Sequence, residues 1–374
     1  MLEIVEVKTR KQIKDFLNLP LKMYKGVEPF VPPLYSDELK MFKKNYMYYD
    51  QSESKFWVAY KDGKCVGRIQ AILQKASNAK WNQKRMRFSR VDFIDDIEVS
   101  KALFDKVEEY AKEKGMSEVV GPLGFSDLER EGMLIKDFES MNTFEEQYNF
   151  PYYMEHMEKL GYGKDVDWIE HRLFVNDEKS KKVLDLKEKI LAKGKIHMVP
   201  KMSLKKFAKL YEKQFFGILD STYDSLYGTV PFTQGMKDLL IKNYRPIINM
   251  DYLKAVVDEN DKIVAFAIAF PAMDKIFKKS NGHLYPQTIV KLLYNVHHPY
   301  AIDLGLVGVA PEGYLNGAAI VIYGALIEQL RKDKAAYCET NLNLEDNTNI
   351  VETWKHFDAI QHKKRRSWVK DITR

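Results

Sequence analysis

The sequence predicts an α+β protein in which one plan of strands and helices occurs twice. With 374 residues, 45% of them hydrophobic, the chain can bury a sizeable core, and its length suits two domains. Two β-hairpins, at 55–73 and 252–270, stand at matching places in the two halves. After each hairpin the order strand, helix, strand, helix, strand follows. We therefore expect two tandem domains, each a mixed, mostly antiparallel sheet flanked by helices.

In the first half, turn residues and hydrophobic spacing place the elements. The hairpin "KFWVAYKDGKCVGRIQAIL" has two β-rich runs around Asp62-Gly63, a pair that supplies the positive-φ position of a tight turn. Val99, Leu103 and Val107 recur at helical spacing and predict a helix that ends at Gly115. The expected elements are a strand at 2–7, a helix from 9–11 to 24, a proline-rich connector at 26–38, the hairpin at 55–73, an arm at 85–94, a helix at 97–114, a strand at 117–122 and a helix at 151–160.

The second half repeats this order and adds an insertion, 271–300, between its hairpin and its central strand. Its expected elements are helices at 203–218 and 232–243, the hairpin at 252–270, strands at 301–309 and 335–344, helices at 317–332 and 347–357, and a last strand at 362–370. The halves are joined by a charged segment, glycine-free over 176–190, that is expected to be helical or extended. The predicted domains are residues 1–175 and 196–374.

Composition and cysteine usage favour a soluble cytoplasmic protein. Charged residues make up 30% of the chain, and the net charge of +6 is spread widely, unlike the concentrated basic stripe typical of nucleic-acid binding. Cys65 and Cys338 lie far apart in hydrophobic runs and are interpreted as buried free thiols. The N-terminus lacks a signal-peptide pattern, and the longest apolar run, 263–273, is too short to span a bilayer. No membrane partner is expected.

Several motifs together carry a resemblance to a known family. They are "EPFVPPL", "GPLGFSDLEREGMLIKDF" and "YNFPYYMEHMEKLGYGKDVDW" in the first half, and "LGLVGVAP", "YLNGAA" and "CETNLNLEDN" in the second. With these motifs the chain resembles the GNAT (N-acetyltransferase) superfamily, and more closely a bacterial group with two tandem GNAT-like domains. The resemblance implies acetyl-CoA, or another acyl-CoA, as cosubstrate of the second domain.

The resemblance also implies an acyl-CoA loop at the start of the helix expected at 317–332. The family pattern is a basic residue or glutamine, two free positions, glycine, one free position, and glycine or alanine. Its positions here are Tyr314, Leu315, Asn316, Gly317, Ala318 and Ala319. Unpaired N–H groups at a helix start hold a pyrophosphate well, and small side chains let it reach the backbone. Tyr314 cannot supply the usual positive charge, which would come from Lys332, Lys334 or elsewhere. Close packing of the helix would explain the small residues equally well.

The first half carries no such loop. Its corresponding segment places four carboxylates near the helix start, at Asp92, Asp95, Asp96 and Glu98. These charges suit the helix dipole themselves and would repel an anion. We expect the first domain to be a degenerate copy that does not bind CoA.

Acyl transfer from a thioester needs an oxyanion donor and an acid for the leaving thiolate. By resemblance, the donor is a backbone N–H within Leu306, Val307, Gly308 and Val309. The acid is usually a tyrosine seven residues after an asparagine; counted from Asn347, that position is Trp354, whose indole is not a usable acid. Tyr323 is the expected substitute and Tyr337 a second, with a plain aromatic core role as the alternative for each.

The general base is expected to be Glu339, with Asp303 as second choice; a solvent-facing or ion-paired role is the alternative for each. Asn347 either contacts the pantetheine arm or caps the helix that follows. His297 and His298 have no further ligands at metal spacing, so no metal is expected.

The sequence thus predicts an N-acyltransferase whose second domain binds acyl-CoA and whose acceptor is a small-molecule or peptide amine. Two other functions remain open. One is a non-catalytic ligand-binding module that keeps the fold, and the other is a Fem-like aminoacyl-tRNA-dependent transferase. The oligomeric state is not predicted.

Overall fold

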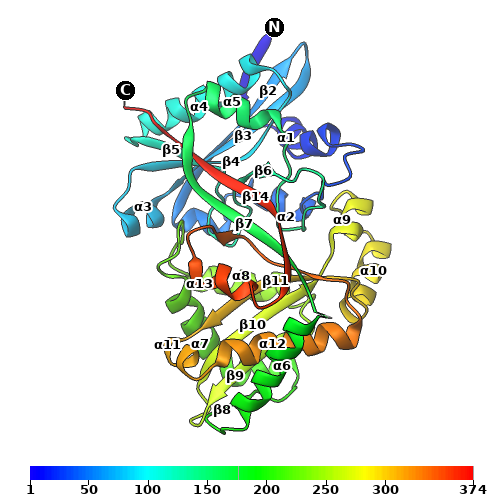
Figure 1. Ribbon diagram of the computed structural model, residues 1–374. Coiled ribbons are helices and arrows are strands. Elements are labelled where there is room, and N and C mark those ends of the chain that lie inside the picture. The colour runs from blue at the N-terminus through cyan, green and yellow to red at the C-terminus, as the bar shows by residue number, and fades with distance from the viewer. Residues whose placement is uncertain (176, 374) are drawn as a thin grey trace.

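The computed structural model describes residues 1–175 and 177–373. One mixed sheet runs through both halves of the chain in the order β1-β2-β3-β4-β5-β14-β7-β12-β11-β10-β9-β8, with β6 beside β14 and β13 beside β7 (Figure 1). Its strands are β1 Leu2–Glu6, β2 Ser52–Lys61, β3 Lys64–Gln74, β4 Arg85–Phe93, β5 Glu118–Gly121, β6 Met133–Lys136, β7 Gly163–Phe174, β8 Ile196–Met198, β9 Leu253–Asp258, β10 Ile263–Pro271, β11 Ile302–Val309, β12 Cys338–Glu339, β13 Asn343–Leu344 and β14 Asp358–Asp371. The predicted α+β class, with a mostly antiparallel sheet between helices, is confirmed.

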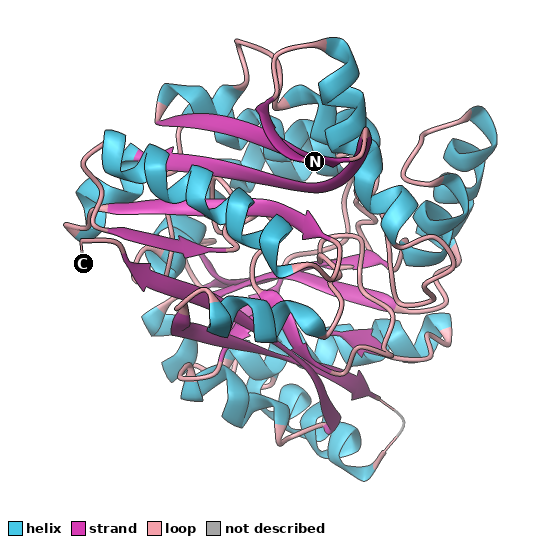
Figure 2. Cartoon of the chain, turned by 90° about the horizontal axis from the view of Figure 1, so that it is seen from above, coloured by secondary structure: helices cyan, strands magenta, loops and turns pink. Residues whose placement is uncertain are grey.

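Helices cover both faces of this sheet (Figure 2). They are α1 Arg10–Met23, α2 Tyr35–Lys40, α3 Lys75–Trp81, α4 Ile97–Glu113, α5 Tyr152–Lys159, α6 Glu178–Leu191, α7 Leu204–Tyr223, α8 Gln234–Tyr244, α9 Asp274–Ser280, α10 Pro286–His297, α11 Pro311–Leu315, α12 Ala318–Asp333 and α13 Thr348–Trp354, with a 3₁₀ turn, η1, at Met47–Asp50. The junction between the halves is therefore helical, as α6, and the insertion at 271–300 forms α9 and α10.

The two halves match element by element. In each half an antiparallel hairpin, β2–β3 or β9–β10, pairs with a third strand, β4 or β11. That strand leads into a helix, α4 or α12, and then into a parallel partner strand, β5 or β12. The first hairpin turns where expected, with positive φ at Asp62 and Gly63. The internal repeat predicted from the sequence is thus present in the fold.

The last strand of each half lies beside the other half. β7 ends the first half but pairs with β12 and β13 of the second. β14 ends the second half but pairs with β5 and β6 of the first. β7 and β14 also pair with each other along most of their length, and Figure 1 shows them crossing the molecule side by side. The halves are therefore joined by exchanged strands.

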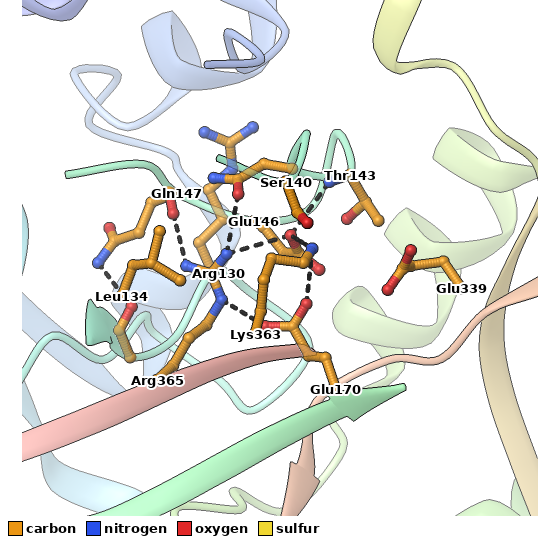
Figure 3. Close-up of polar contacts among 12 residues, drawn as sticks. Arg130, Leu134, Ser140, Thr143, Glu146, Gln147, Glu170, Glu339, Lys363 and Arg365 are labelled. Atoms are coloured by element: carbon orange, nitrogen blue, oxygen red, sulfur yellow. Dashed lines mark hydrogen bonds and ion pairs between the residues drawn. The ribbon is translucent and has the colours of Figure 1, made fainter. Parts of the chain in front are cut away.

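A buried ionic cluster fixes this junction (Figure 3). Lys363 of β14 is fully buried, and its Nζ lies 2.5 Å from Glu146 Oε2 and 2.7 Å from Glu170 Oε2. Arg365, two residues on, contacts the same two carboxylates at 3.1 and 2.7 Å. Because two cations face two carboxylates, the charges balance inside the protein. The cluster ties the loop that carries Glu146 to both exchanged strands.

The strand expected at 335–344 is wrong as a single element. β12 covers only Cys338–Glu339 and β13 only Asn343–Leu344. The reason is that β12 pairs with both β11 and β7, whereas β13 pairs with β7 and makes no ladder with β11. The strand propensity of residues 335–344 predicts an extended chain. It does not predict that this chain pairs with β11 only at its beginning and then continues beside β7 alone.

Candidate functional site

The central strand of the second half separates from its parallel neighbour. β11 pairs with β12 only at Ile302–Cys338 and Asp303–Glu339. Immediately afterwards the register of β11 against β10 shifts by one residue, which leaves Gly305 as the extra residue of a β-bulge. A bulge bends a strand and increases its twist, so β11 turns away at this point. A Cβ at Gly305 would lie 2.5 Å from the ring of Phe270, which explains the glycine.

A cavity of about 640 Å³ occupies the gap and extends toward the first half. Its second-half walls come from β11, α12, α13, the segment 340–344, and helices α7 and α8. Asn341 crosses the gap, with its Nδ2 donating to the carbonyl of Gly305 at 2.6 Å. Tyr223 of α7 donates to the carbonyl of Val307 at 3.4 Å. The carbonyl groups of Gly305 and Val307 therefore point toward side chains that line the cavity.

The structure brings many of the predicted cofactor residues into this cavity. Its lining includes Leu306, Val307, Val309, Tyr314, Ala319, Asn347 and Trp354, as well as the proposed acid Tyr323. Gly308, Leu315, Asn316, Gly317 and Ala318 do not line it. Leu315 points outward and is 89% exposed, and Gly308 packs closely on Phe266.

Gly317 begins α12 in the left-handed conformation, with φ +76°. A Cβ there would lie 2.7 Å from Cδ1 of Ile190 on α6. Packing and backbone geometry thus both require glycine at this position. The first turn of α12 still leaves N–H groups without intrahelical acceptors, so an anion site at this helix start stays a prediction.

The basic residues suggested for a phosphate are at the wrong end of the helix. Lys332 lies in the last turn of α12 and Lys334 is its C-cap. At 1.5 Å per residue, they are about 22–26 Å from Gly317 along the helix axis. Among the described residues, no lysine, arginine or histidine lines the cavity.

Glu339, the first choice for the base, is built into an ionic cluster beside the cavity. It is 3% exposed, Arg172 donates to its Oε2 at 3.1 Å, and His362 contacts its Oε1. It is absent from the cavity lining, as is Tyr337, which stacks against the guanidinium of Arg172. Glu339 therefore lies in an ion-paired position, which is the alternative to a role as general base.

Asp303, the second choice, lines the cavity where β11 and β12 separate. Its Oδ2 is buried and accepts no hydrogen bond from any described residue. Burial, followed by the charges of Asp274 and Glu339, raises the pKa of Asp303 well above its ordinary value. A carboxyl group with these properties suits proton transfer.

The remaining aromatic and amide candidates shape the cavity wall. Tyr323 packs edge-on against Trp354, with ring centroids 5.6 Å apart, and burial raises the pKa of its hydroxyl. The indole Nε1 of Trp354 donates to Asn343 Oδ1 at 2.9 Å, so this side chain is held in place. Asn347 caps α13, with its Oδ1 accepting from the N–H of Ile350 at 3.4 Å, and it also lines the cavity.

The first half contributes acidic side chains that the sequence analysis missed. Among the described residues, six carboxyl groups line the cavity: Asp127, Glu129, Glu131, Glu145 and Glu146 from the first half, and Asp303 from the second. Among described residues, only Glu129 and Glu146 of these form ion pairs. Glu131 is 5% exposed, its Oε1 has no hydrogen-bond partner in the described chain, and burial raises its pKa well above the ordinary value. In the sequence, these acidic groups could have been found only from the acidic runs "SDLERE" and "FEE".

The carboxylates at the start of the first-half helix are used internally. Asp96 caps α4, with its Oδ1 accepting from the N–H of Glu98 at 3.0 Å. Asp92 is buried against Arg68 at 2.6 Å, and Asp95 contacts His156. The helix start therefore already carries a negative group, and the absence of CoA binding by this half stays a prediction.

Three further features of the described residues concern metal binding, membrane spanning and the cysteines. Within the described residues, no group of three or more His, Cys, Asp or Glu side chains is arranged to hold a metal ion. In the same part of the chain, no helix combines the length and hydrophobicity needed to cross a bilayer. Both cysteines are free thiols, as predicted, with Cys338 buried and Cys65 partly buried.

Known structures share this architecture. The chain is similar to a tandem GNAT protein from the clavulanic acid biosynthesis pathway, with a TM-score of 0.57, 12% identity and coverage of 100% of this chain and 99% of that one. It is also similar to a GCN5-related N-acetyltransferase from Sphaerobacter thermophilus, with a TM-score of 0.55, 10% identity and coverage of 99% and 96%. The chain therefore has the GNAT acetyltransferase fold, in its tandem form.

One sequence relative matches nearly end to end. Protein YghO of Escherichia coli K12 is 25% identical over 373 residues, covering 97% of this chain and 94% of its own. A bacterial ceramide synthase of Caulobacter vibrioides is 23% identical over 299 residues, covering 79% of this chain and 76% of its own. No protein-family model matches the chain.

Proposed function

We propose that the protein is an N-acyltransferase that moves an acyl group from acyl-CoA to an amine in the cavity beside β11. The carrying observation is the separation of β11 from β12 at a bulge, with the cavity in the resulting gap. A thioester bound there would supply the acyl group. The walls of the gap, Val307, Ala319, Asn347 and Trp354, would hold its pantetheine arm, with the backbone at the start of α12 toward the phosphates.

The residues around the gap can take the three chemical roles. The peptide of Val307 faces the gap, so its N–H can stabilise the oxyanion of the tetrahedral intermediate. Asp303 can remove a proton from the incoming amine. The hydroxyl of Tyr323, whose raised pKa keeps it protonated, can donate to the leaving thiolate.

The acceptor is an amine because the cavity is acidic. Asp127, Glu131 and Glu145 are supplied by the first half and line the cavity without an ion-pair partner in the described chain. A cationic acceptor would neutralise these groups on binding. In this proposal residues 1–175 form a unit that shapes the acceptor side, and residues 196–374 form the acyl-CoA unit. The free thiols suit a reducing cytoplasm.

Thiol release during acyl transfer tests the proposal. Acetyl-CoA and longer acyl-CoAs are offered with a panel of amines, and kcat/KM is followed against pH. We expect the rate to rise with pH as Asp303 loses its proton, and Asp303→Asn to lower kcat by about 100-fold or more. Asp358→Asn, at an exposed position of β14, is the control. A melting temperature that does not respond to millimolar acetyl-CoA or CoA would contradict acyl-CoA binding; binding without turnover would favour the non-catalytic module.

A long-chain amine is the acceptor to test first. Beside the carboxylates, α7, α8 and β10 line the cavity with apolar side chains, among them Phe216, Leu219, Leu240 and Phe270. A long-chain amine matches both parts of this lining, because its ammonium group suits the carboxylates and its alkyl chain suits the apolar side chains. The ceramide synthase relative points the same way. Equal turnover of short and long-chain amines would argue against this acceptor class while leaving acyl transfer intact.

A further inference from the structure

The insertion at 271–300 presents an exposed apolar surface. Of the fifteen large hydrophobic side chains that are exposed in the described chain, six lie within residues 284–294. They are Leu284, Tyr285, Ile289, Val290, Leu293 and Tyr294, and they are between 44% and 67% exposed. We name these six residues the α10 patch. Figure 1 shows α10 at an edge of the molecule. A patch of this kind on a folded protein marks an interaction site.

The patch is held rigidly from behind. Leu292 and Val296, on the opposite face of α10, are buried against the body of the protein. Asn295 Nδ2 donates to the carbonyl of Ala272 at 3.0 Å, and Asn249 Nδ2 donates to that of Val296 at 2.8 Å. The inner face of α10 is therefore packed and hydrogen-bonded to the rest of the protein. Its outer face is exposed and has no packing partner in the described chain.

Both halves of the protein anchor the insertion. The N–H of Tyr35, in the first half, donates to the carbonyl of Gly282 at 3.0 Å. Lys278 pairs with Glu28 at 2.6 Å. Gly282 has φ +72° and lies so close to Pro33 that a Cβ would come within 1.9 Å of its carbonyl oxygen. The outer face of α10 is thus displayed in one fixed orientation.

The charge around the patch is positive. Residues 271–300 contain Lys275, Lys278, Lys279 and Lys291 against a single acid, Asp274, a formal net charge of +3. Asp274 is 6% exposed and accepts a hydrogen bond from Tyr300, and Lys278 is offset by Glu28, so Lys275, Lys279 and Lys291 supply the positive charge of this segment. Apolar side chains set among lysines fit an anionic lipid surface. In a symmetric contact with a second copy, the same lysines would face one another.

We propose that α10 docks the protein on anionic phospholipid bilayers, with the α10 patch inserted into the interface and the lysines against the headgroups. Twelve residues of helix extend about 18 Å, which is too short to span a bilayer, so the helix lies in the membrane plane. The absence of a spanning segment, which led to the expectation of no membrane partner, does not bear on such surface binding. The inference is independent of acyl transfer.

Vesicle flotation of the full-length protein tests the inference. Wild type is expected to float with vesicles of phosphatidylglycerol and phosphatidylcholine, and to float less with phosphatidylcholine alone or at high salt. Val290→Ser, Leu293→Ser and Tyr294→Ser combined should weaken vesicle binding by at least about tenfold. The matched control combines Leu186→Ser, Leu210→Ser and Ile360→Ser, which are 43%, 49% and 56% exposed outside the patch and should leave binding unchanged.

Charge is tested separately. Lys279→Gln and Lys291→Gln should each weaken binding to the anionic vesicles by up to about fivefold and flatten its salt dependence. Melting temperatures confirm that each variant is folded. Wild type that stays in solution with both vesicle types overturns the inference, as does a patch variant that floats like wild type. Self-association that the patch variant abolishes would instead make this face a contact between copies of the chain, and would also overturn it.

Discussion

Removal of Lys363 should destabilise the whole protein. This side chain joins the exchanged strands β7 and β14 to the loop that carries Glu146 and lines the cavity. In Lys363→Met the residue stays apolar and of similar length, but Glu146 and Glu170 keep two negative charges against Arg365 alone. Breaking a buried, hydrogen-bonded ion pair from one side costs about 3–5 kcal/mol. Lys363 is 0% exposed and lies within 2.7 Å of both carboxylates, so the full range applies. For a chain of this size the melting temperature should fall by about 4–6 °C.

The sign of its pH dependence follows from Glu170. Burial and the neighbouring Glu146 already raise the pKa of Glu170 to about 7. Without Lys363 the pKa of Glu170 rises further. At low pH Glu170 is protonated, and the variant then loses less stability because the unpaired negative charge is gone. The loss of unfolding free energy therefore grows as pH increases. Thermal unfolding at about pH 5.5 and pH 8 measures this. Lys363→Met with Glu170→Gln restores charge balance and should recover part of the loss. A single variant no less stable than Lys101→Met, a change in an exposed pair, would refute the reasoning.

Three further substitutions probe the start of α12 and two residues of the cavity wall. Gly317→Ala should lower unfolding free energy by about 1–2 kcal/mol, because φ is +76° and Ile190 lies 2.7 Å from the new Cβ; chemical denaturation measures it. Burial raises the pKa of Glu131, so the folded state retains a proton that the unfolded chain releases, and wild-type stability falls as pH rises above about 4.3. Glu131→Gln should remove that fall, and its melting temperature should exceed wild type most at alkaline pH. Trp354→Phe keeps an aromatic ring but leaves Asn343 Oδ1 unpaired, so it should cost about 1–2 kcal/mol in the same denaturation assay.

The sequence was sufficient for local elements and for the repeat. Hairpins, helix periodicity and cap glycines are short-range signals, and Gly115 and Gly161 both have positive φ as expected at helix ends. The loop that begins α12 was recognisable because glycine and alanine at a helix start have a local physical meaning. Of that loop, Tyr314 and Ala319 line the cavity, whereas Gly317 and Ala318 do not.

The pairing of strands that are far apart in the sequence could not be predicted from such local signals. Nothing near β14 in the sequence shows that it pairs with β5 and β7, since strand propensity does not name a partner. The choice between Glu339 and Asp303 depended on this pairing. His362 of β14 and Arg172 of β7 surround Glu339, whereas Asp303 has no such neighbours. Gly305 was a local clue, because an isolated glycine in a strand often marks a bulge.

The first half is more than a vestigial copy, because the cavity depends on it. At the start of α4 the side chain of Asp96 accepts from the N–H of Glu98. Its loops nevertheless supply Asp127, Glu131 and Glu145 to the cavity wall. Glu146 follows directly and is held by Lys363, a residue of the final strand. Strand β14 thus fixes the loop that gives the cavity its acidity, so loss of β14 from the sheet would disorganise this wall of the cavity as well as the junction.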